Sequence, residues 1–322
     1  MGVNLKDIVP HEPIGFESLK RKTIAIDAMN SLYQFLSSIR QPDGTPLMDS
    51  HGRITSHLSG LFYRTIKLID MGIKPIYVFD GEPPELKMRE IQRRKEAKEE
   101  AQIEWKRALK ERRIDDAKKF AKRTSTFTEE MITDSKRILS YMGIPYIQAP
   151  GEGEAQCVLI CNREDAWAVG SQDYDSLLLG ARRLIRGLTL SGKFELTSVE
   201  LERVLNTLKI TREQLIDIAI LVGTDFNEGV KGIGPKKALK IVKENRISEI
   251  DVDFDIDAIR DIFLHPKVTD NYNIEWRMPD IDKIIDFLCN ERDFSQERVE
   301  KASHNLISAM NELSQKDLSA WF

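Results

Sequence analysis

Acidic residues stand at the ends of several short apolar runs, a pattern that suits metal chemistry. Asp27 ends KTIAID and Asp80 ends KPIYVFD, while Glu152 and Glu154 follow IPYIQAP. If these runs are parallel strands, their carboxyl ends meet at one edge of a sheet, where ligands bind in open α/β folds. The pattern predicts one pocket that collects seven acids: Asp27, Asp80, Glu152, Glu154, Asp173, Asp175 and, after a helix-like run, Asp225.

Carboxylates gathered in this way repel one another. Two like charges 4 Å apart cost roughly 4 kcal/mol at an effective dielectric near 20. Divalent cations offset this cost, and oxygen ligands without nearby His or Cys favour Mg²⁺ or Mn²⁺ over Zn²⁺. Two such ions suit in-line displacement at a phosphate. Taken singly, each acid has an alternative role as a turn former or helix cap, but that alternative must then hold independently at every strand end.

A glycine- and lysine-rich segment follows the last of these acids. Residues 229–242 read GVKGIGPKKALKIV, in which Gly232 and Gly234 permit tight turns and Pro235 suits the first turn of a helix. Backbone N–H groups at a helix N-terminus hold phosphate, and Lys236 and Lys237 add positive charge. The segment predicts a helix–two-turn–helix motif that grips a duplex backbone without reading its sequence. The alternative is an ordinary Gly-Pro turn between helices.

The acids depend for their positions on short strands that alternate with helices. This alternation predicts an α/β fold with a mostly parallel central sheet flanked by helices. The chain is expected to be mostly helical from about residue 198, with a loop-rich packing segment over 265–280. We expect strands at 22–27, 74–81, 144–150 and 166–175, a fifth at 182–189, and helices at 30–40, 54–72, 86–120, 128–143 and 151–165.

The charge of the chain is unevenly distributed. Its net charge is −4, yet residues 87–123 contain 15 Lys or Arg and 8 Asp or Glu and so carry +7. A basic segment beside an acidic remainder indicates a polyanion grip next to a cation site. No apolar run has the roughly 18 residues of a membrane span, so no membrane partner is expected. The three cysteines do not suggest a disulfide scaffold, which favours an intracellular protein. Cys157 and Cys161, one helical turn apart, are expected to pack rather than to bind metal.

Taken together, six segments resemble the flap endonucleases of the structure-specific 5′ nuclease family. They are IAIDAMNSLYQFL, YVFDGEPPELK, APGEGEAQC, SQDYDSLL, LVGTDFNEGVKGIGPKKAL and the terminal QKDLSAWF. The resemblance spans essentially the whole chain in order. A chain that ends on the last motif without a basic extension is more similar to the archaeal branch, which implies a cytoplasmic (nucleoid) location. The resemblance implies a PIN-like 5′ nuclease fold with a helical gateway and cap over residues 87–127.

The resemblance also implies roles for individual residues. Two Mg²⁺ ions, with Mn²⁺ as a substitute, would share the acids: Asp27, Asp80, Glu152 and Glu154 at the first site, and Asp173, Asp175 and Asp225, with Glu154 nearby, at the second. Lys87 and Arg94 match basic gateway residues that stabilise charge on the scissile phosphate; seven residues apart, they face nearly the same way on a helix. The free amine of Gly2 would lie near the active site. DNA contacts are implied for Tyr33, Arg40, Arg64, Glu152, Gly223, Asp225, Gly232, Gly234, Lys236 and Lys237.

The C-terminal residues match a docking peptide for a sliding clamp (PCNA). Gln315, Leu318, Trp321 and Phe322 follow Q-x-x-L-x-x-W-F, and the last three can form one apolar plug on a tight helix. The alternative is that this peptide folds back on the protein's own core. The expected organisation is an N-terminal nuclease region (1–98), a helical cap (99–127), an internal nuclease region with the helix–two-turn–helix (128–258), a C-terminal packing segment (259–314) and the clamp peptide (315–322).

The sequence therefore predicts a monomeric, Mg²⁺-dependent endonuclease that cuts 5′ flaps at junctions of single- and double-stranded DNA. A 5′-3′ exonuclease activity and roles in Okazaki fragment maturation and DNA repair are implied by the resemblance. Two alternatives differ in class. An aspartyl-nucleophile phosphatase needs D-x-D, but Met29 stands two residues after Asp27. A DNA scaffold that lost its chemistry would not need a complete set of carboxylates.

Overall fold

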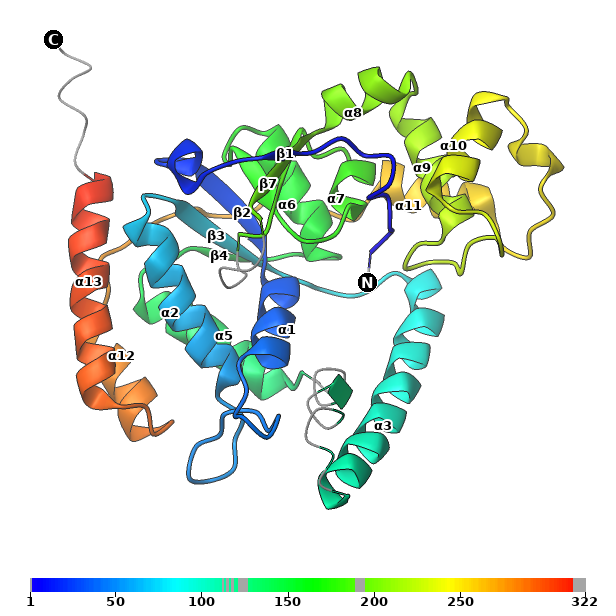
Figure 1. Cartoon of the computed structure of the whole chain (residues 1–322). Coiled ribbons are helices and arrows are strands. Elements are labelled where there is room, and N and C mark those ends of the chain that lie inside the picture. The colour runs from blue at the N-terminus through cyan, green and yellow to red at the C-terminus, as the bar shows by residue number, and fades with distance from the viewer. Residues whose placement is uncertain are drawn as a thin grey trace, which may run out of the picture.

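A central seven-stranded sheet organises the part of the chain that the structure describes (Figure 1). The structure is a computed structural model that describes residues 2–111, 113, 116, 119–120, 127–188 and 195–314. The strand order is β1-β7-β6-β5-β2-β3-β4, and the block from β6 to β4 is parallel. The strands are β1 (Glu12–Pro13), β2 (Thr23–Asp27), β3 (Lys74–Phe79), β4 (Tyr146–Gln148), β5 (Ala168–Gly170), β6 (Arg183–Arg186) and β7 (Thr197–Glu200).

Helices cover both faces of this sheet because its strands are apolar on both sides. Side chains alternate between faces along a strand. Ala25 of β2 packs into the core beneath α6, α7 and α9, whereas Ile24 and Ile26 pack into the core beneath α1, α2, α5 and α13. The helices around the sheet are α1 (Ala28–Ser38), α2 (Ser56–Asp70), α5 (Glu129–Tyr141), α6 (Gly153–Asn162), α7 (Asp175–Leu178), α8 (Leu201–Leu208), α9 (Arg212–Val222) and α13 (Gln296–Ser314).

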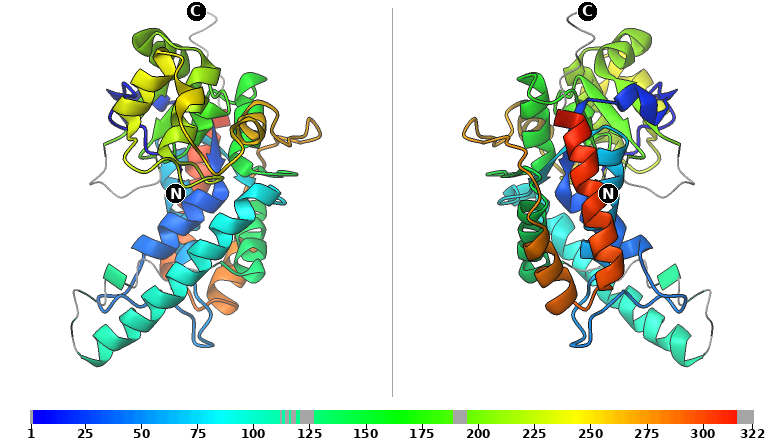
Figure 2. Two further views of the ribbon diagram at one scale, coloured as in Figure 1. Left: turned by 90° about the vertical axis from the view of Figure 1, so that its right-hand side faces the viewer. Right: turned by 90° about the vertical axis from the view of Figure 1, so that its left-hand side faces the viewer.

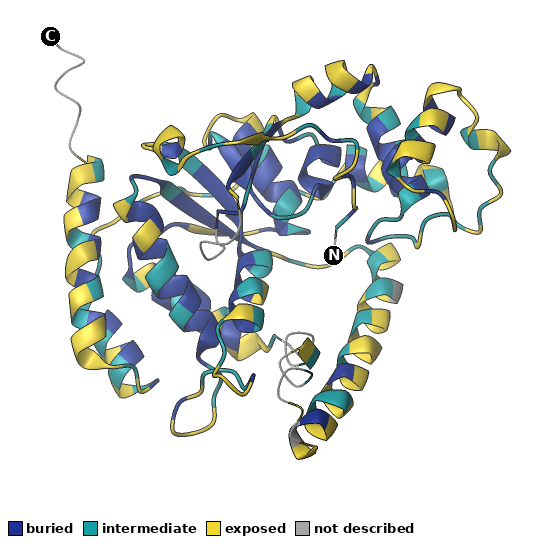
Figure 3. Cartoon of the chain, in the orientation of Figure 1, coloured by how far each residue is buried: buried dark blue, intermediate teal, exposed yellow. Residues whose placement is uncertain are grey.

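One long helix stands apart from this layered body. α3 (Met88–Lys110) follows the short 3-10 helix Glu85–Lys87 and projects from the molecule in the views of Figures 1 and 2. Its surface is largely exposed or half-buried, as Figure 3 shows. Its sequence is dominated by charge, and pairs such as Glu90 and Arg94 one turn apart support it where packing does not. The predicted domain boundary at residues 98 and 99 falls inside this helix.

Helices also form the region beyond β7. α9 and α10 (Pro235–Lys243) pack together and are joined by residues 223–234. α11 (Ile256–Leu264) packs on α9. The predicted loop segment 265–280 is confirmed, because no helix or strand is assigned within it. α12 (Ile281–Ile285) and a π-helical turn (Asp286–Asn290) lead to α13.

One expected strand was too long, and two short strands were missed. The strand expected over 166–175 ends at Gly170, because the Ser171 hydroxyl accepts a hydrogen bond from the backbone N–H of Asp173 (3.2 Å) and bends the chain away from the sheet. The chain is mostly helical from about residue 198, as expected, but the sequence analysis missed β7, which pairs antiparallel with β6, and β1, which pairs antiparallel with β7. Strands of two and four residues carry too little periodicity to be recognised. None of the helices assigned to the described residues is long and apolar enough to cross a membrane.

Candidate functional site

The acidic groups at the ends of β2 and β3 are fixed by the starts of two helices. Asp27 is the last residue of β2, and its carboxylate caps α1 by accepting a hydrogen bond from the Asn30 N–H (3.0 Å). Asp80 follows β3 and accepts a hydrogen bond from the N–H of Gly153 at the start of α6 (2.7 Å). A Cβ on Gly153 would lie 2.7 Å from the Asp80 carboxylate, so glycine permits this approach. Glu152 is therefore held beside Asp80.

The acids that follow β5 are held by hydroxyl, amide and backbone donors. Glu154, in the first turn of α6, accepts hydrogen bonds from the hydroxyls of Ser171 (2.6 Å) and Ser176 (2.9 Å). Asp173 accepts one from the side-chain amide of Asn30 (2.9 Å), which lies on α1. Elements from both halves of the parallel sheet thus meet on one set of carboxylates.

The N-terminal segment closes this pocket from one side. The backbone N–H of Val3 donates a hydrogen bond to the Asp175 carboxylate (2.8 Å). A Cβ on Gly2 would lie 2.6 Å from the Asp173 Cβ and 2.9 Å from the Asp175 Oδ2, so no larger residue fits without a shift. The structure places Gly2 beside the two aspartates, as the sequence predicts.

Burial in this pocket disfavours the charged forms of Asp27, Asp175 and Glu154. Burial, together with the charge of Asp80, raises the pKa of Asp27 to about 8. Burial and the charge of Asp225 raise the pKa of Asp175 to about 7. Burial and the charges of Asp175 and Asp173 raise the pKa of Glu154 well above its ordinary value. These mutual influences show that acids from separate strands share one electrostatic pocket.

Two basic residues of the α3 region enter this pocket. The ammonium group of Lys87 pairs with Glu152 and lies 3.4 Å from Asp225. The Arg94 guanidinium lies 2.5 Å from the other oxygen of Asp225 and also bonds Glu90 (2.9 Å). Burial opposes a charged Lys87, but the carboxylates outweigh it and raise the Lys87 pKa. Burial likewise opposes a charged Asp225, yet Lys87 and Arg94 lower its pKa overall.

The donor set suits a hard divalent cation. All seven groups offer carboxylate oxygens, the ligands that Mg²⁺ prefers, and the raised pKa values of Asp27 and Asp175 show that the protein alone does not compensate their charge. In the described part of the chain, no three acid, His or Cys side chains are arranged so that they would chelate one ion. Glu152 and Asp225 are instead paired with Lys87 and Arg94.

Three residues expected to contact DNA, Tyr33, Arg40 and Arg64, lie on or next to α1 and α2. Tyr33, on α1, is 36% exposed; its ring lies 6.2 Å from that of Phe127, and the Lys98 ammonium of α3 lies over it at 5.5 Å. Arg40 follows α1 and donates to the carbonyl of Gly44 (2.9 Å), while Arg64 is half-buried on α2. The contact between Lys98 and Tyr33 thus joins α3 to α1.

The residues expected to grip the duplex lie in and after the connection between α9 and α10. Gly223 and Gly232 have positive φ values of 111° and 81°, so the turns there use glycine's freedom. Gly234 is the N-cap of α10, and Lys236 and Lys237 are exposed in its first turn. The α3 region reaches this connection, since Arg93 lies 2.9 Å from Glu228.

Several residues of the pocket were missed by the sequence analysis. Asn30, Ser171 and Ser176 hold the carboxylates, and Glu90 holds Arg94. The spacing carried part of this signal, because Asn30 lies one helical turn after Asp27 and Glu90 one turn before Arg94. The expected clamp-binding residues, Gln315, Leu318, Trp321 and Phe322, lie outside the described residues.

Comparison with known proteins gives consistent matches over the whole chain. The family models described as the XPG N-terminal domain and the XPG I-region match residues 1–101 and 143–225, and these two stretches contain all seven acids. Flap endonuclease 1 of Pyrococcus furiosus is 52% identical over 338 residues, covering 100% of this chain and 99% of the relative. Flap endonuclease 1 of Methanothermobacter thermautotrophicus is 51% identical, covering 100% of both chains.

Solved structures agree with these sequence matches. Flap endonuclease-1 from Methanococcus jannaschii superposes with a TM-score of 0.81 at 47% identity and covers 97% of this chain and 99% of its own. The catalytic core of Rad2 in complex with DNA substrate superposes with a TM-score of 0.74 at 26% identity, covering 95% of this chain and 100% of its own.

Proposed function

The chain belongs to the flap endonuclease 1 family of structure-specific nucleases, and from this premise we propose how its carboxylate pocket cuts DNA. Its activity is that of a structure-specific flap endonuclease. The observation that carries the mechanism is that buried acids from separate strand ends converge on one pocket. The raised pKa values of Asp27 and Asp175 indicate that the surrounding protein does not neutralise their negative charge. The reaction is hydrolysis of a phosphodiester, in which water attacks phosphorus and the trimmed strand keeps a 5′-phosphate.

Two Mg²⁺ ions are the proposed cofactors, with Mn²⁺ as a substitute. Asp27, Asp80, Glu152 and Glu154 would hold the first, and Asp173, Asp175 and Asp225, with Glu154 nearby, the second. Such ions supply Lewis-acid chemistry, lowering the pKa of the attacking water and neutralising the leaving oxygen. The chain's own contribution is to fix the carboxylates: the hydroxyls of Ser171 and Ser176 hold Glu154, and Asn30 holds Asp173.

Lys87 and Arg94 are the proposed catalytic cations. They are positioned to stabilise negative charge on the scissile phosphate and not to transfer a proton. Without DNA they neutralise Glu152 and Asp225. A bound phosphodiester carries negative charge to the same place, so the two cations can exchange one anionic partner for another without leaving the pocket. As charge develops on the phosphoryl oxygens, both groups stabilise it.

DNA would be gripped on either side of this pocket. The N-terminus of α10 with Lys236 and Lys237 offers donors and charge to a duplex phosphate, while Tyr33 offers a ring on which a base can stack. α3 contacts the α9–α10 connection through Arg93 and Glu228, and it contacts α1 through Lys98 and Tyr33. A free 5′ end is proposed to pass beside α3, which would account for both flap cleavage and 5′-3′ exonuclease activity.

The cellular role follows from this substrate. Trimming 5′ flaps would serve Okazaki fragment maturation and DNA repair, with the enzyme acting as a monomer in the cytoplasm (nucleoid) of an archaeal cell. The proposed partner is the sliding clamp (PCNA), docked through residues 315–322. Deleting that peptide is expected to abolish stimulation by the clamp and to leave intrinsic cleavage intact.

A labelled double-flap substrate tests the proposal. Wild-type protein should cut it at the junction with Mg²⁺ but not with EDTA, and should cut a blunt duplex far more slowly. Asp175→Ala should bind the flap without cutting it. Binding without cutting by the wild-type protein under all conditions would favour a DNA scaffold, and cutting by Asp175→Ala at the wild-type rate would remove Asp175 from the mechanism.

A further inference from the structure

A second site lies on the opposite side of the molecule from α3. A cavity of about 390 Å³ is enclosed by three segments: the α2–β3 turn, the loop 265–280 and the end of α13. Its apolar lining includes Ile73, Pro75, Trp276, Met278, Met310 and Leu313. Ile73 is fully buried, whereas Met278 at the rim is 54% exposed. This "α13 groove" shares no residue with the carboxylate pocket.

The groove offers a positive charge as well as apolar surface. The Lys74 ammonium lies over the Trp276 ring at 5.6 Å, and both residues line the groove. An occupant that combines apolar side chains with an acidic residue would match both features.

We propose that the α13 groove is the docking site for residues 315–322 of the same chain. The last described residue, Ser314, itself lines the groove, so the next eight residues begin at its edge. An extended chain covers at most about 3.6 Å per residue, so Trp321 reaches no farther than about 25 Å from Ser314 and easily folds back over the groove.

The composition of this segment fits the groove. Leu318, Trp321 and Phe322 supply apolar side chains, and aromatic residues bury about 150–250 Å² each. Asp317 carries the charge opposite to that of Lys74, which lines the groove. Docking also removes an exposed Trp-Phe pair from solvent, where such a patch favours aggregation.

The consequence is competition between two docking partners for one peptide. The groove holds residues 315–322 in the free protein, and any partner that binds these residues must first draw them out. The inference does not rest on the identity of that partner, nor on the nuclease mechanism, because the groove and the carboxylate pocket are separate.

Full-length protein with Trp321→Ala and Phe322→Ala together tests the docking. The methyl signals of Met278 and Met310 in NMR spectra should shift, because a nearby indole ring no longer perturbs them. Amide hydrogen exchange at residues 276–278 should become about tenfold faster as the covering segment detaches. Ser319→Ala, a polar change in the same segment, should alter neither. Identical methyl signals and exchange in the wild-type and doubly substituted proteins would overturn the proposal.

A change in the groove gives the reciprocal test. In protein labelled with 5-fluorotryptophan, Met278→Asp should move the fluorine resonance of Trp321 to its solvent-exposed position. Met48→Asp, which alters another exposed methionine (46%) outside the groove, should leave it unmoved. Flap cleavage should be unchanged in both variants. A Trp321 resonance that ignores Met278→Asp, or a shift that depends on protein concentration, would contradict docking within one chain.

Discussion

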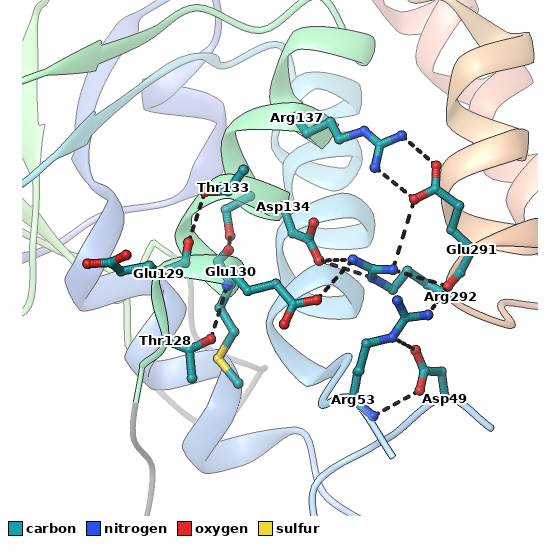
Figure 4. Close-up of polar contacts among 12 residues, drawn as sticks. Asp49, Arg53, Thr128, Glu129, Glu130, Thr133, Asp134, Arg137, Glu291 and Arg292 are labelled. Carbon is teal, nitrogen blue, oxygen red and sulfur yellow. Dashed lines mark hydrogen bonds and ion pairs between the residues drawn. The ribbon is translucent and has the colours of Figure 1, made fainter. Parts of the chain in front are cut away.

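Two clusters of charged residues in this molecule are arranged in opposite ways. The carboxylate pocket gathers acids from several strand ends, and burial raises the pKa values of Asp27 and Asp175. The second cluster, the α5 network, joins α5 to the loop before α2 and to the segment before α13 (Figure 4). There each acid has a basic partner: Asp49–Arg53 (2.7 Å), Asp134–Arg292 (2.7 Å) and Glu291–Arg137 (2.5 Å).

This difference in pairing distinguishes acids that are available for function, in the carboxylate pocket, from acids that stabilise the structure, in the α5 network. In the α5 network, Arg53 overcomes the effect of burial and lowers the pKa of Asp49, and bonding to Arg137 lowers the pKa of Glu291. Burial raises the pKa of Asp134 even so, although its partner Arg292 lies 2.7 Å away. In the carboxylate pocket, Lys87 and Arg94 lower the pKa of Asp225, whereas burial also raises the pKa of Asp80 and of Glu154. A set of acids that the protein leaves under-compensated is ready for an external cation, whereas a fully paired set fixes neighbouring segments.

The largest expected effect comes from removing one charge in the pocket. Asp175→Asn keeps the shape and an acceptor for the Val3 N–H but removes a proposed metal ligand, so we expect kcat to fall by about 10³-fold or more. Because it also removes repulsion, the free energy of unfolding without metal should rise by on the order of 1 kcal/mol. Single-turnover cleavage and urea unfolding measure the two effects.

The α5 network supplies the control for that variant. Asp134→Asn should leave the cleavage rate of the folded enzyme unchanged. It should lower the stability, because it leaves the buried Arg292 guanidinium without the charge of its closest partner. Both outcomes are the reverse of those expected for Asp175→Asn. The same sign of stability change in both variants would erase the distinction between the two clusters.

Removing the ammonium group of Lys87 from the carboxylate pocket is expected to have the next largest effect. Lys87→Ala removes a group proposed to stabilise developing phosphoryl charge, so kcat should fall by about 10²–10³-fold with a smaller change in KM. Lys95→Ala, on the exposed surface of α3, the helix that follows Lys87, should change kcat little. An equal loss in both variants would mean that Lys87 contributes only to the general positive charge of α3.

Breaking a pair in the α5 network should act on stability alone. Asp134→Ala leaves Arg292, whose side chain is 7% exposed, without its closest partner. We expect a loss of about 3 kcal/mol, at the low end for a buried pair because Glu130 and Glu291 remain within 3.4 and 4.0 Å. Thermal and urea unfolding measure it. A loss below about 0.5 kcal/mol would show that the pair behaves like an exposed one.

The smallest expected effect is a pH dependence beside the same network. His57 is buried, and burial together with the charge of Arg292 lowers its pKa from 6.5 to about 3. The folded protein therefore keeps His57 neutral while the unfolded chain protonates, so the stability present above pH 6.5 is lost as the pH falls towards 3. Relative to His57→Leu, wild type should lose about 2 kcal/mol between pH 7 and pH 5. Parallel stability curves for the two proteins would show that His57 does not titrate as described.

The parallel sheet and its acidic edge could be predicted because their signals are local and repeated. Asp27 and Asp80 each end a run of β-branched and aromatic residues, and parallel pairing then places them together. β1 and β7 were missed because strands of two and four residues are defined by their pairing with a neighbour rather than by their own pattern. Asp173 and Asp175 were assigned to a strand, although a serine hydroxyl had already turned the chain.

The residues that hold the carboxylates in place were less predictable than the carboxylates themselves. Asn30, Ser171 and Ser176 are common polar residues whose role depends on which carboxylate the fold brings within reach. The basic character of residues 87–123 was visible in the sequence, but the pairing of Lys87 with Glu152 joins positions 65 residues apart. The α5 network was missed for the same reason, since Asp134 and Arg292 are 158 residues apart.

Counting bound Mn²⁺ by electron paramagnetic resonance tests the central claim most directly. The wild-type protein with uncut flap DNA should bind two ions per chain, close enough for their signals to couple, about 3.5–4 Å apart. Asp175→Asn should lose at least one ion, and Asp134→Asn should keep both. Equal binding by wild type and Asp175→Asn, or two ions that show no coupling, would contradict a shared carboxylate pocket as the catalytic centre.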